Sequence, residues 1–228
     1  MKYIKKIAEP AKFKAYRSIR GVTYAGMTLE AKKDLRDALL ISQGYICCYC
    51  MQRVAADNCK IEHFKPQNIY NGKKGKPDLT LNYLNLFIAC TGNEGQDPKR
   101  QTCDTRKGPD ELFHIRLLDK TWDNVFKYSA DGTISTIVEN ELLTNEIEDM
   151  LNLNEGTLKR NRSAVYKVII KRFQEAQKEG RYSIAFLNKE LKHWQGRNAE
   201  NQYQEYCMVA VYLIQKHIIR IQNQQKGR

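Results

Sequence analysis

Four cysteines between residues 47 and 103 form the most specific chemical pattern in this chain of 228 residues. Cys47 and Cys50 have the Cys-x2-Cys spacing, which places two thiolates on one tight turn at a separation that suits a tetrahedral ion. Cys90 and Cys103 would complete a four-cysteine site and close residues 91–102 into a loop. We therefore predict that these four side chains hold a structural zinc ion. Free cysteines are often simply buried, and this is the expectation for the remaining ones, Cys48, Cys59 and Cys207.

A second set of residue types that could do chemistry lies inside this frame. Glu62 offers a hard oxygen ligand for magnesium or a similar ion, and His63 can take a proton from water near neutral pH. Asp104 could supply a second ligand to the same ion. Such an ion would polarise a phosphate, so the pattern is typical of phosphodiester hydrolysis. An isolated Glu-His pair is more often a plain surface pair, but its position between two cysteine pairs favours the catalytic interpretation.

Further residues are candidates for positioning the site or contacting a nucleic acid. Asn85 could bridge backbone groups after the strand and thereby orient His63, and Asn82 is the less suitable alternative. Basic side chains near the site are candidate phosphate contacts: Arg106, Lys107 and, in the loop of residues 71–77, Lys73 and Lys74.

The composition favours a polyanionic partner. Lys and Arg number 38 against 26 Asp and Glu, which gives a net charge of +12. Such an excess attracts phosphates without regard to sequence, so DNA or RNA is the expected partner. We expect a cytoplasmic chain with reduced thiols, no signal peptide and no membrane partner, because no apolar run approaches the length of a bilayer span.

The candidate site residues must be positioned by helices and strands, several of which the sequence predicts. Thr28 is a candidate helix cap and Gly44 a helix end, so a helix is expected between them, after a basic and largely irregular arm. Strand character is expected at residues 59–64, and a hairpin with an Asp131-Gly132 turn at residues 124–137. Apolar side chains at helical spacing then predict about four helices, the last of them including Tyr203 and Tyr206.

These expectations give an α+β chain of three parts. They are an N-terminal basic arm and helix (1–44), a core with the candidate site and the zinc clamp (45–138), and a helical C-terminal domain (139–228).

The motif resembles that of the HNH endonucleases, on Cys47-x2-Cys50, Glu62-His63, Asn85, Cys90 and Cys103-Asp104. The resemblance implies a ββα-metal core, which is a β-hairpin followed by a helix that together grip one catalytic divalent ion. It assigns Glu62 as a metal ligand, His63 as the general base and Asn85 as the middle Asn. The final His or Asn of the motif falls on Asp104, which is a departure from the family. His114 is a poor substitute because it sits among apolar residues.

Within this family, the chain is most similar to the PtuB-type nucleases of Septu anti-phage systems, including those attached to retrons. The grounds are the Ile61–Pro66 run, the split second cysteine pair and the helical C-terminal half. The resemblance implies an effector nuclease with a PtuA-type ATPase partner and, where a retron is attached, a reverse transcriptase with its RNA–DNA. The chain has no Gly-x4-Gly-Lys-Ser/Thr loop, so we do not expect it to hydrolyse ATP itself.

Two other functions stay open on the sequence. The chain could be a non-catalytic zinc module that binds nucleic acid through its charge. It could also be an interaction subunit whose helical half is the functional part. DNA is the favoured substrate of the nuclease, and RNA, including tRNA, is the alternative.

Overall fold

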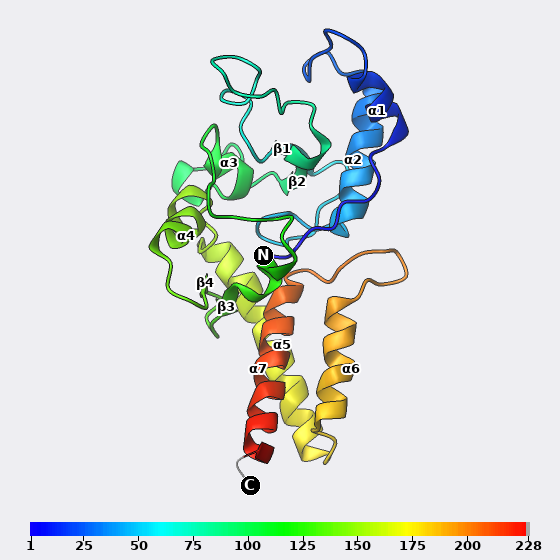
Figure 1. Cartoon of the computed structure of the whole chain (residues 1–228). Helices are drawn as coiled ribbons and strands as arrows, with labels where there is room; N and C mark the ends of the chain where they lie inside the picture. The colour runs from blue at the N-terminus through cyan, green and yellow to red at the C-terminus, as the bar shows by residue number, and fades with distance from the viewer. Residues whose placement is uncertain (227–228) are drawn as a thin grey trace.

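The computed structural model of the chain describes residues 1–226, in which short helices and two small antiparallel sheets form a body and three long helices project from it (Figure 1). The α-helices in chain order are α1 (Ala11–Arg17), α2 (Leu29–Gln43), α3 (Cys103–Lys107), α4 (Glu141–Asn145), α5 (Gly156–Lys178), α6 (Ile184–Gln195) and α7 (Cys207–Lys226). The strands are β1 (Cys59–His63), β2 (Leu86–Cys90), β3 (Phe126–Tyr128) and β4 (Ile134–Thr136). Short 3-10 turns precede β2, α3 and β3, and a π-helical turn, Glu146–Met150, extends α4.

Helix α2 forms where the sequence predicts it and supports one side of the first sheet. The Thr28 hydroxyl accepts a hydrogen bond from the Ala31 amide at 3.2 Å, and Gly44 ends the helix in the left-handed region at φ 59°. The Gln43 side chain then pairs with the backbone of Ile88 in β2, accepting at 2.7 Å and donating at 2.8 Å. The end of α2 is thereby fixed to the centre of the strand.

Strands β1 and β2 form an antiparallel hairpin that α3 follows in the chain. Cys59 lies opposite Cys90, and His63 lies opposite Leu86. All five residues of β2 are buried, whereas β1 is buried only at Glu62 and His63. The segment of residues 64–85 connects the strands. Two strands followed by a short helix is the element order that the resemblance to HNH endonucleases implies for the core.

The second hairpin joins the body to the helical half. Strands β3 and β4 pair around the predicted Asp131-Gly132 turn. Arg162 of α5 is only 1% exposed and donates to the Gly132 carbonyl at 2.6 Å and to the Leu153 carbonyl at 2.7 Å. One set of buried apolar side chains continues from the body into α5, α6 and α7. The predicted helical region from residue 139 onward is therefore present.

The start of the last helix differs from the sequence prediction. Tyr203 and Tyr206 have helical spacing, yet α7 begins only at Cys207. The Tyr203 amide donates to the Gly44 carbonyl at 3.0 Å, and the Tyr206 amide donates to the Met51 carbonyl at 3.1 Å. These contacts with the body hold the segment outside a helix. Among the helices of residues 1–226, none has the length and apolar character needed to cross a membrane.

Candidate metal centre and active site

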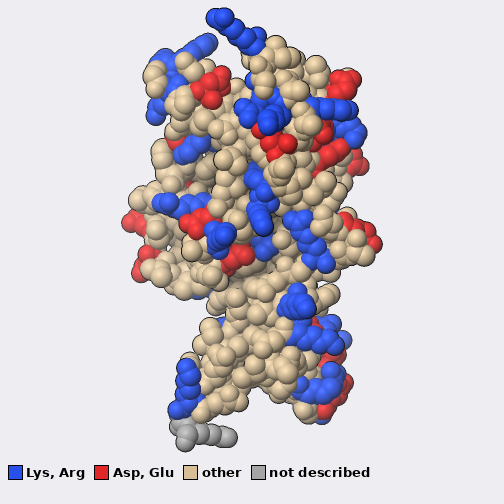
Figure 2. Space-filling view, turned by 45° about the vertical axis from the view of Figure 1, so that its right-hand side comes forward, with Lys and Arg blue, Asp and Glu red and all other residues tan. Residues whose placement is uncertain are grey.

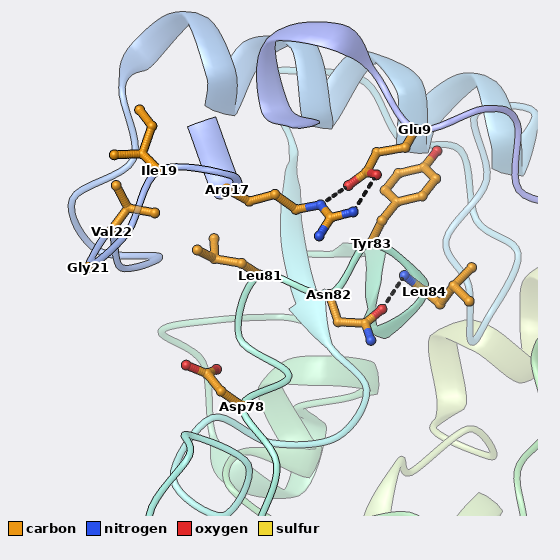
Figure 3. A pocket seen from close by; sticks show the side chains of 10 residues that line it. All are labelled: Glu9, Arg17, Ile19, Gly21, Val22, Asp78, Leu81, Asn82, Tyr83 and Leu84. Carbon is orange, nitrogen blue, oxygen red and sulfur yellow. Dashed lines mark hydrogen bonds and ion pairs between the residues drawn. The ribbon is translucent and has the colours of Figure 1, made fainter. Parts of the chain in front are cut away.

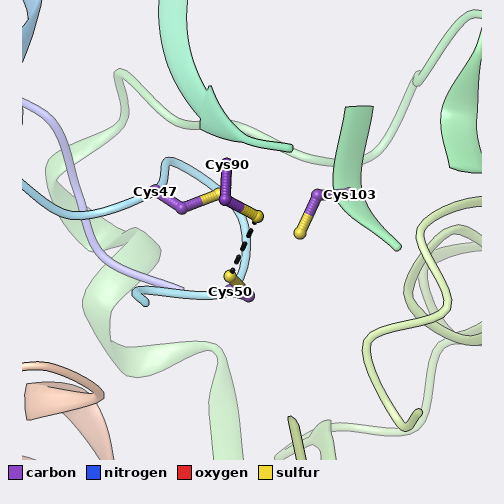
Figure 4. Close-up of side chains that lie close together, drawn as sticks. All are labelled: Cys47, Cys50, Cys90 and Cys103. Carbon is purple, nitrogen blue, oxygen red and sulfur yellow. Dashed lines mark hydrogen bonds between the residues drawn. The ribbon is translucent and has the colours of Figure 1, made fainter. Parts of the chain in front are cut away.

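The four cysteines predicted to bind zinc converge on one point (Figure 4). The sulfur atoms of Cys47, Cys50, Cys90 and Cys103 all lie within 4.8 Å of one another, and all four residues are buried. The Cys50 and Cys90 sulfurs are 3.8 Å apart. Four ligands at the ~2.3 Å zinc–sulfur bond length of a tetrahedral site would be separated by about 3.8 Å. The donor set and its spacing therefore fit a zinc ion.

The loop between the second cysteine pair closes tightly. The Thr102 amide donates to the Gly92 carbonyl at 2.9 Å, and the Thr105 hydroxyl donates to the Thr91 carbonyl at 2.7 Å. Gly92 has φ 55°, and a Cβ atom there would lie 2.1 Å from the Thr102 carbonyl oxygen. Glycine is thus required for this close approach. The closure returns Cys103 to the side of Cys90 despite the intervening residues.

The cluster favours a thiolate at Cys47. Burial opposes this charge, but hydrogen bonds from neighbouring thiols, that of Cys103 above all, hold the pKa of Cys47 well below its ordinary value. The thiolate is the form of cysteine that binds metals. Within residues 1–226, this is the one group of three or more His, Cys, Asp or Glu side chains that converges closely enough to hold an ion. Cys48 and Cys207 are buried, as expected, and Cys59 is partly exposed.

Glu62 lies buried next to three polar side chains. Its carboxylate accepts a hydrogen bond from the Tyr49 hydroxyl at 2.7 Å and pairs with the Lys107 ammonium at 2.8 Å. Burial raises the pKa of Glu62 well above its ordinary value, and the carboxyl of Asp104, within hydrogen-bonding reach, adds to this increase. A nearby carboxyl group strengthens the affinity of Glu62 for a proton or a cation. The two predicted ligands are therefore side by side.

Lys107 does not have the role that the sequence analysis gave it. Its side chain is 1% exposed and faces Glu62. It also donates to the His63 carbonyl at 3.3 Å. A buried ammonium in this position neutralises a carboxylate, so the expected phosphate contact by Lys107 is not found. His114 is also engaged elsewhere, because its Nδ1 lies 3.0 Å from the carboxylate of Glu146.

His63 is 6% exposed and held at both ring nitrogens. Its Nε2 lies 2.9 Å from the Thr80 carbonyl oxygen, which can only accept, so Nε2 carries the proton. Its Nδ1 then has the lone pair and accepts from the Gln67 amide at 3.2 Å. Burial lowers the pKa of His63, and the Thr80 carbonyl opposes that shift. The neutral imidazole is the form that can accept a proton at Nδ1.

Asn85 joins the two ends of the segment that surrounds His63. Its Oδ1 accepts from the Lys65 amide at 2.7 Å, and its Nδ2 donates to the carbonyls of Lys65 at 3.0 Å and of Leu79 at 3.1 Å. Lys65 follows His63 closely in the chain, and Leu79 precedes Thr80. Asn85 therefore makes the backbone bridges expected of a positioning residue. Asn82 is exposed and caps only the Leu84 amide, at 2.9 Å.

Sequence reasoning missed several residues that shape the site. Tyr49, inside the first cysteine pair, binds Glu62, and its place in that tight turn was the available signal. Tyr24 packs edge-on against His63, with ring centroids 4.4 Å apart. Burial, followed by the charge of Asp104, raises the pKa of Tyr24 to about 12, so it stays a neutral phenol. Thr80 acts through its carbonyl, which has no sequence signature.

The remaining basic candidates lie at the surface. Lys73 and Lys74 are exposed in the loop before β2. Arg106 is exposed too, and its guanidinium donates to the Asp149 carbonyl at 3.1 Å. Figure 2 shows Lys and Arg side chains over much of one face, on the body and on the projecting helices, with fewer acidic side chains between them. The positive charge is thus spread widely.

Comparison with known proteins agrees with the motif. The chain is 29% identical over 165 residues to a protein of Vibrio cholerae serotype O1 biovar El Tor described as a "Retron Vc95 putative HNH endonuclease". The match covers 71% of this chain and 76% of that protein. No protein-family model matches the chain. The similarity confirms the resemblance to HNH endonucleases, including retron-associated ones, that the motif indicates.

Proposed function

We propose that this chain is a metal-dependent HNH endonuclease that hydrolyses phosphodiester bonds. One observation supports the proposal above the others, namely that the buried Glu62 carboxyl lies next to His63 at the end of β1, where burial and then the nearby Asp104 carboxyl raise the pKa of Glu62. The cysteine cluster that braces this arrangement fits a structural zinc ion. The catalytic ion would be magnesium or another divalent ion, held by Glu62 and Asp104, which are oxygen ligands suited to it.

The mechanism assigns one task to each side chain. A divalent ion bound by the two carboxylates would polarise the scissile phosphate and stabilise the leaving oxygen. The hydrogen bond between the Gln67 amide and His63 Nδ1 first breaks, and Nδ1 then accepts a proton from water. The Thr80 carbonyl keeps its hydrogen bond to Nε2 and so holds the opposite edge of the ring. The water oxygen then attacks phosphorus, and the bond from phosphorus to the leaving oxygen breaks. Asn85 keeps the two backbone segments in place.

The proposed substrate rests on the net charge of the chain, and the proposed biological role rests on the description of the similar protein. DNA is the favoured substrate, RNA is the alternative, and the net charge of +12 serves both. The relative's description places it in a retron, which supports an effector role in anti-phage defence in the cytoplasm. A PtuA-type ATPase and a retron reverse transcriptase with its RNA–DNA are the proposed partners. The proposed division is an arm and helix (1–44), a nuclease core (45–138) and a helical domain (139–228).

Nuclease activity of the purified chain tests the proposal. Supercoiled plasmid and total RNA would be incubated with the chain in magnesium, in manganese and without added divalent ion, alone and with any co-purifying partner. We expect cleavage that requires the added ion, with zinc present in every sample. Tight binding of both nucleic acids without cleavage under any of these conditions would instead identify a non-catalytic zinc module. In that case the Lys107–Glu62 ion pair would be purely structural.

A further inference from the structure

An open groove on the body is unsuited to nucleic acid. Its volume is 620 Å³, and it lies between the turn that joins α1 to α2 and the segment that precedes β2 (Figure 3). Glu9 and Asp78 line it together with Arg17, and Arg17 Nη2 is already paired with Glu9 Oε2 at 2.7 Å. A lining with net negative charge disfavours a phosphate backbone. We therefore looked for a surface on the body that combines cations with an accessible aromatic ring.

Phe113 is exposed to an extent that no other described aromatic side chain shares. Among the Phe, Tyr and Trp side chains of residues 1–226, that of Phe113 is the only one that is exposed, at 66%. Its backbone is held in place, because the buried carboxylate of Glu146 accepts from the amides of Phe113 at 2.6 Å and of Ile115 at 2.9 Å. A ring on a fixed backbone loses little conformational freedom when a partner packs against it.

Two lysines and a second aromatic ring lie near Phe113. The Lys65 ammonium is 5.2 Å from the centroid of the Phe113 ring and 5.9 Å from that of Tyr70. The ammonium of the exposed Lys76 is 5.4 Å from the Tyr70 centroid. Glu111 accepts from Lys65 at 2.7 Å and from the Tyr70 hydroxyl at 2.6 Å, so it offsets the charge of Lys65 and leaves that of Lys76. We call Lys65, Tyr70, Lys76 and Phe113 the aromatic patch.

The aromatic patch borders the proposed site. Lys65 is two residues after His63, and its amide donates to Oδ1 of the positioning residue Asn85 at 2.7 Å. Phe113 lies on the segment that follows α3, the helix that packs its last residue against the site. The Lys65 ammonium donates to the Leu112 carbonyl at 3.1 Å and so joins this segment to the one that follows β1. Both elements that carry the site thus continue directly into the aromatic patch.

We propose that the aromatic patch binds a single-stranded part of the nucleic acid, with an unpaired base stacked on Phe113 and a phosphate at Lys76. The inference rests on the proposed nuclease function and names the part of the substrate that this surface contacts. Proteins bind single strands with little sequence preference by combining exposed aromatic rings with cations. A base inside a duplex is covered on both faces by its neighbours, so an unpaired base is preferred.

Binding of two octamers of equal charge tests the stacking contact. One is a single-stranded oligonucleotide of mixed sequence, prepared as DNA and as RNA, and the other is the same sugar–phosphate backbone without bases. Affinity is measured by fluorescence anisotropy without added divalent ion, for the wild type, Phe113→Ala and Phe113→Trp. Val168→Ala is the matched control, because Val168 is another exposed apolar side chain, located on α5. Thermal melting checks that each variant is folded.

We expect the wild type to bind the base-carrying octamer about tenfold more tightly than the baseless one. Phe113→Ala should reduce this ratio to about threefold or less, whereas Phe113→Trp, which keeps a ring, and Val168→Ala should retain it. Equal binding of both octamers by the wild type, or an unchanged ratio in Phe113→Ala, would overturn the inference even if the chain cleaves nucleic acid. Conversely, a chain that never cleaves but shows the Phe113-dependent ratio would disprove the nuclease function and leave the stacking contact standing.

Lys76→Gln tests the phosphate contact in the same assay. Because both octamers carry the phosphates, the substitution should weaken the binding of both by a similar factor, about threefold, and leave their ratio unchanged. Lys167→Gln, which removes an exposed lysine of α5, is the control and should weaken binding less. Equal weakening by the two lysine variants would overturn the assignment of a phosphate to Lys76.

Discussion

At the scale of single residues, Glu62 shows how the site balances charge. Its carboxylate is buried with that of Asp104 beside it, and the Lys107 ammonium supplies an internal cation. A buried carboxylate beside a second, half-buried one is strongly unfavourable without a counter-ion. Lys107 therefore stabilises the site, and in the proposed mechanism a divalent ion would share the carboxylates with it.

Lys107→Met should make the chain depend on divalent ions for stability. Without such ions, melting should show a loss of up to about 3–5 kcal/mol, the cost of breaking a buried ion pair. Added magnesium or manganese should then raise the melting temperature more in the variant than in the wild type, because the carboxylates need a cation. Lys33→Met, which removes an exposed ion pair with Asp37, should change neither quantity. A smaller ion-induced rise in Lys107→Met than in the wild type would contradict this account.

Tyr49→Phe should impair the positioning of Glu62 while leaving the chain folded. The substitution removes the hydroxyl that donates to Glu62, which should lower the free energy of unfolding by about 1 kcal/mol. The turn that carries Cys47 and Cys50 is unchanged. Partners that orient metal ligands are typically worth 10- to 100-fold, so cleavage should fall by about that factor. The measurement is single-turnover cleavage together with zinc content. Tyr45→Phe, beside the same turn, is the control and should cleave normally. Normal cleavage by Tyr49→Phe as well would mean that Glu62 needs no such support.

Sequence reasoning selected the candidate residues of the site but not the residues that support them. Glu62, His63 and Asp104 were selected by type and spacing, and the structure brings them together. Tyr49 and Thr80 were missed because one looks like a spacer and the other acts through its backbone. The burial of Lys107 could not be foreseen either, because it depends on a contact with Glu62 that only the tertiary fold creates.

At the scale of elements, the cysteine cluster ties the hairpin to its surroundings. It joins the turn before β1, the end of β2 and the first residue of α3. Strands of five residues and a helix of five residues bury too little surface to be stable in isolation. A metal ion at this junction would supply the missing free energy.

Cys103→Ser should therefore cost far more than an ordinary buried substitution. We expect loss of the bound zinc and a fall in unfolding free energy of several kcal/mol, out of the ~10 kcal/mol that a structural zinc can supply. Metal analysis and denaturant unfolding measure the two effects. Cys207→Ser is the matched control, because Cys207 is equally buried but lies outside the cluster. If both variants kept one zinc ion per chain, the proposed cluster would not be the zinc site.

Asn85→Ala should loosen the segment that surrounds His63. Three hydrogen bonds to backbone groups of Lys65 and Leu79 are lost, at a cost of about 2 kcal/mol. Because Thr80 follows Leu79, the ring of His63 loses its fixed orientation, and cleavage should fall at least tenfold with zinc retained. Asn140→Ala, which removes the cap of α4, should cost about 1 kcal/mol and leave cleavage intact. Equal cleavage by the two variants would rule out the positioning role.

The element boundaries were predictable where local chemistry sets them. Thr28 and Gly44 delimit α2, and Asp131-Gly132 marks the second hairpin, because caps and turns are encoded by neighbouring residues. The start of α7 was not predictable. Tyr203 and Tyr206 have helical spacing, and only their hydrogen bonds to the distant Gly44 and Met51 keep them out of the helix.

At the scale of the whole molecule, the candidate site and the long C-terminal helices occupy different parts of the structure. The candidate site lies in the body, near the first hairpin, while α5, α6 and α7 extend away from it (Figure 1). The net charge of +12 is distributed over both parts, so nucleic acid can be attracted without one dedicated basic cleft. The α+β character was predictable from composition and periodicity, whereas this arrangement depends on contacts such as that of Arg162 with Gly132.

The most direct test of the account is single-turnover cleavage of a plasmid or RNA substrate by the wild type and by His63→Ala, with zinc measured in both. We predict that His63→Ala keeps one zinc ion per chain and a cooperative melting transition, lowered by the about 1–3 kcal/mol that its lost hydrogen bonds cost, but loses about 10²- to 10⁴-fold in rate, the usual contribution of a general base. Cleavage by His63→Ala at the wild-type rate, with both proteins folded and zinc-loaded, would contradict the assignment of His63 and with it the proposed mechanism.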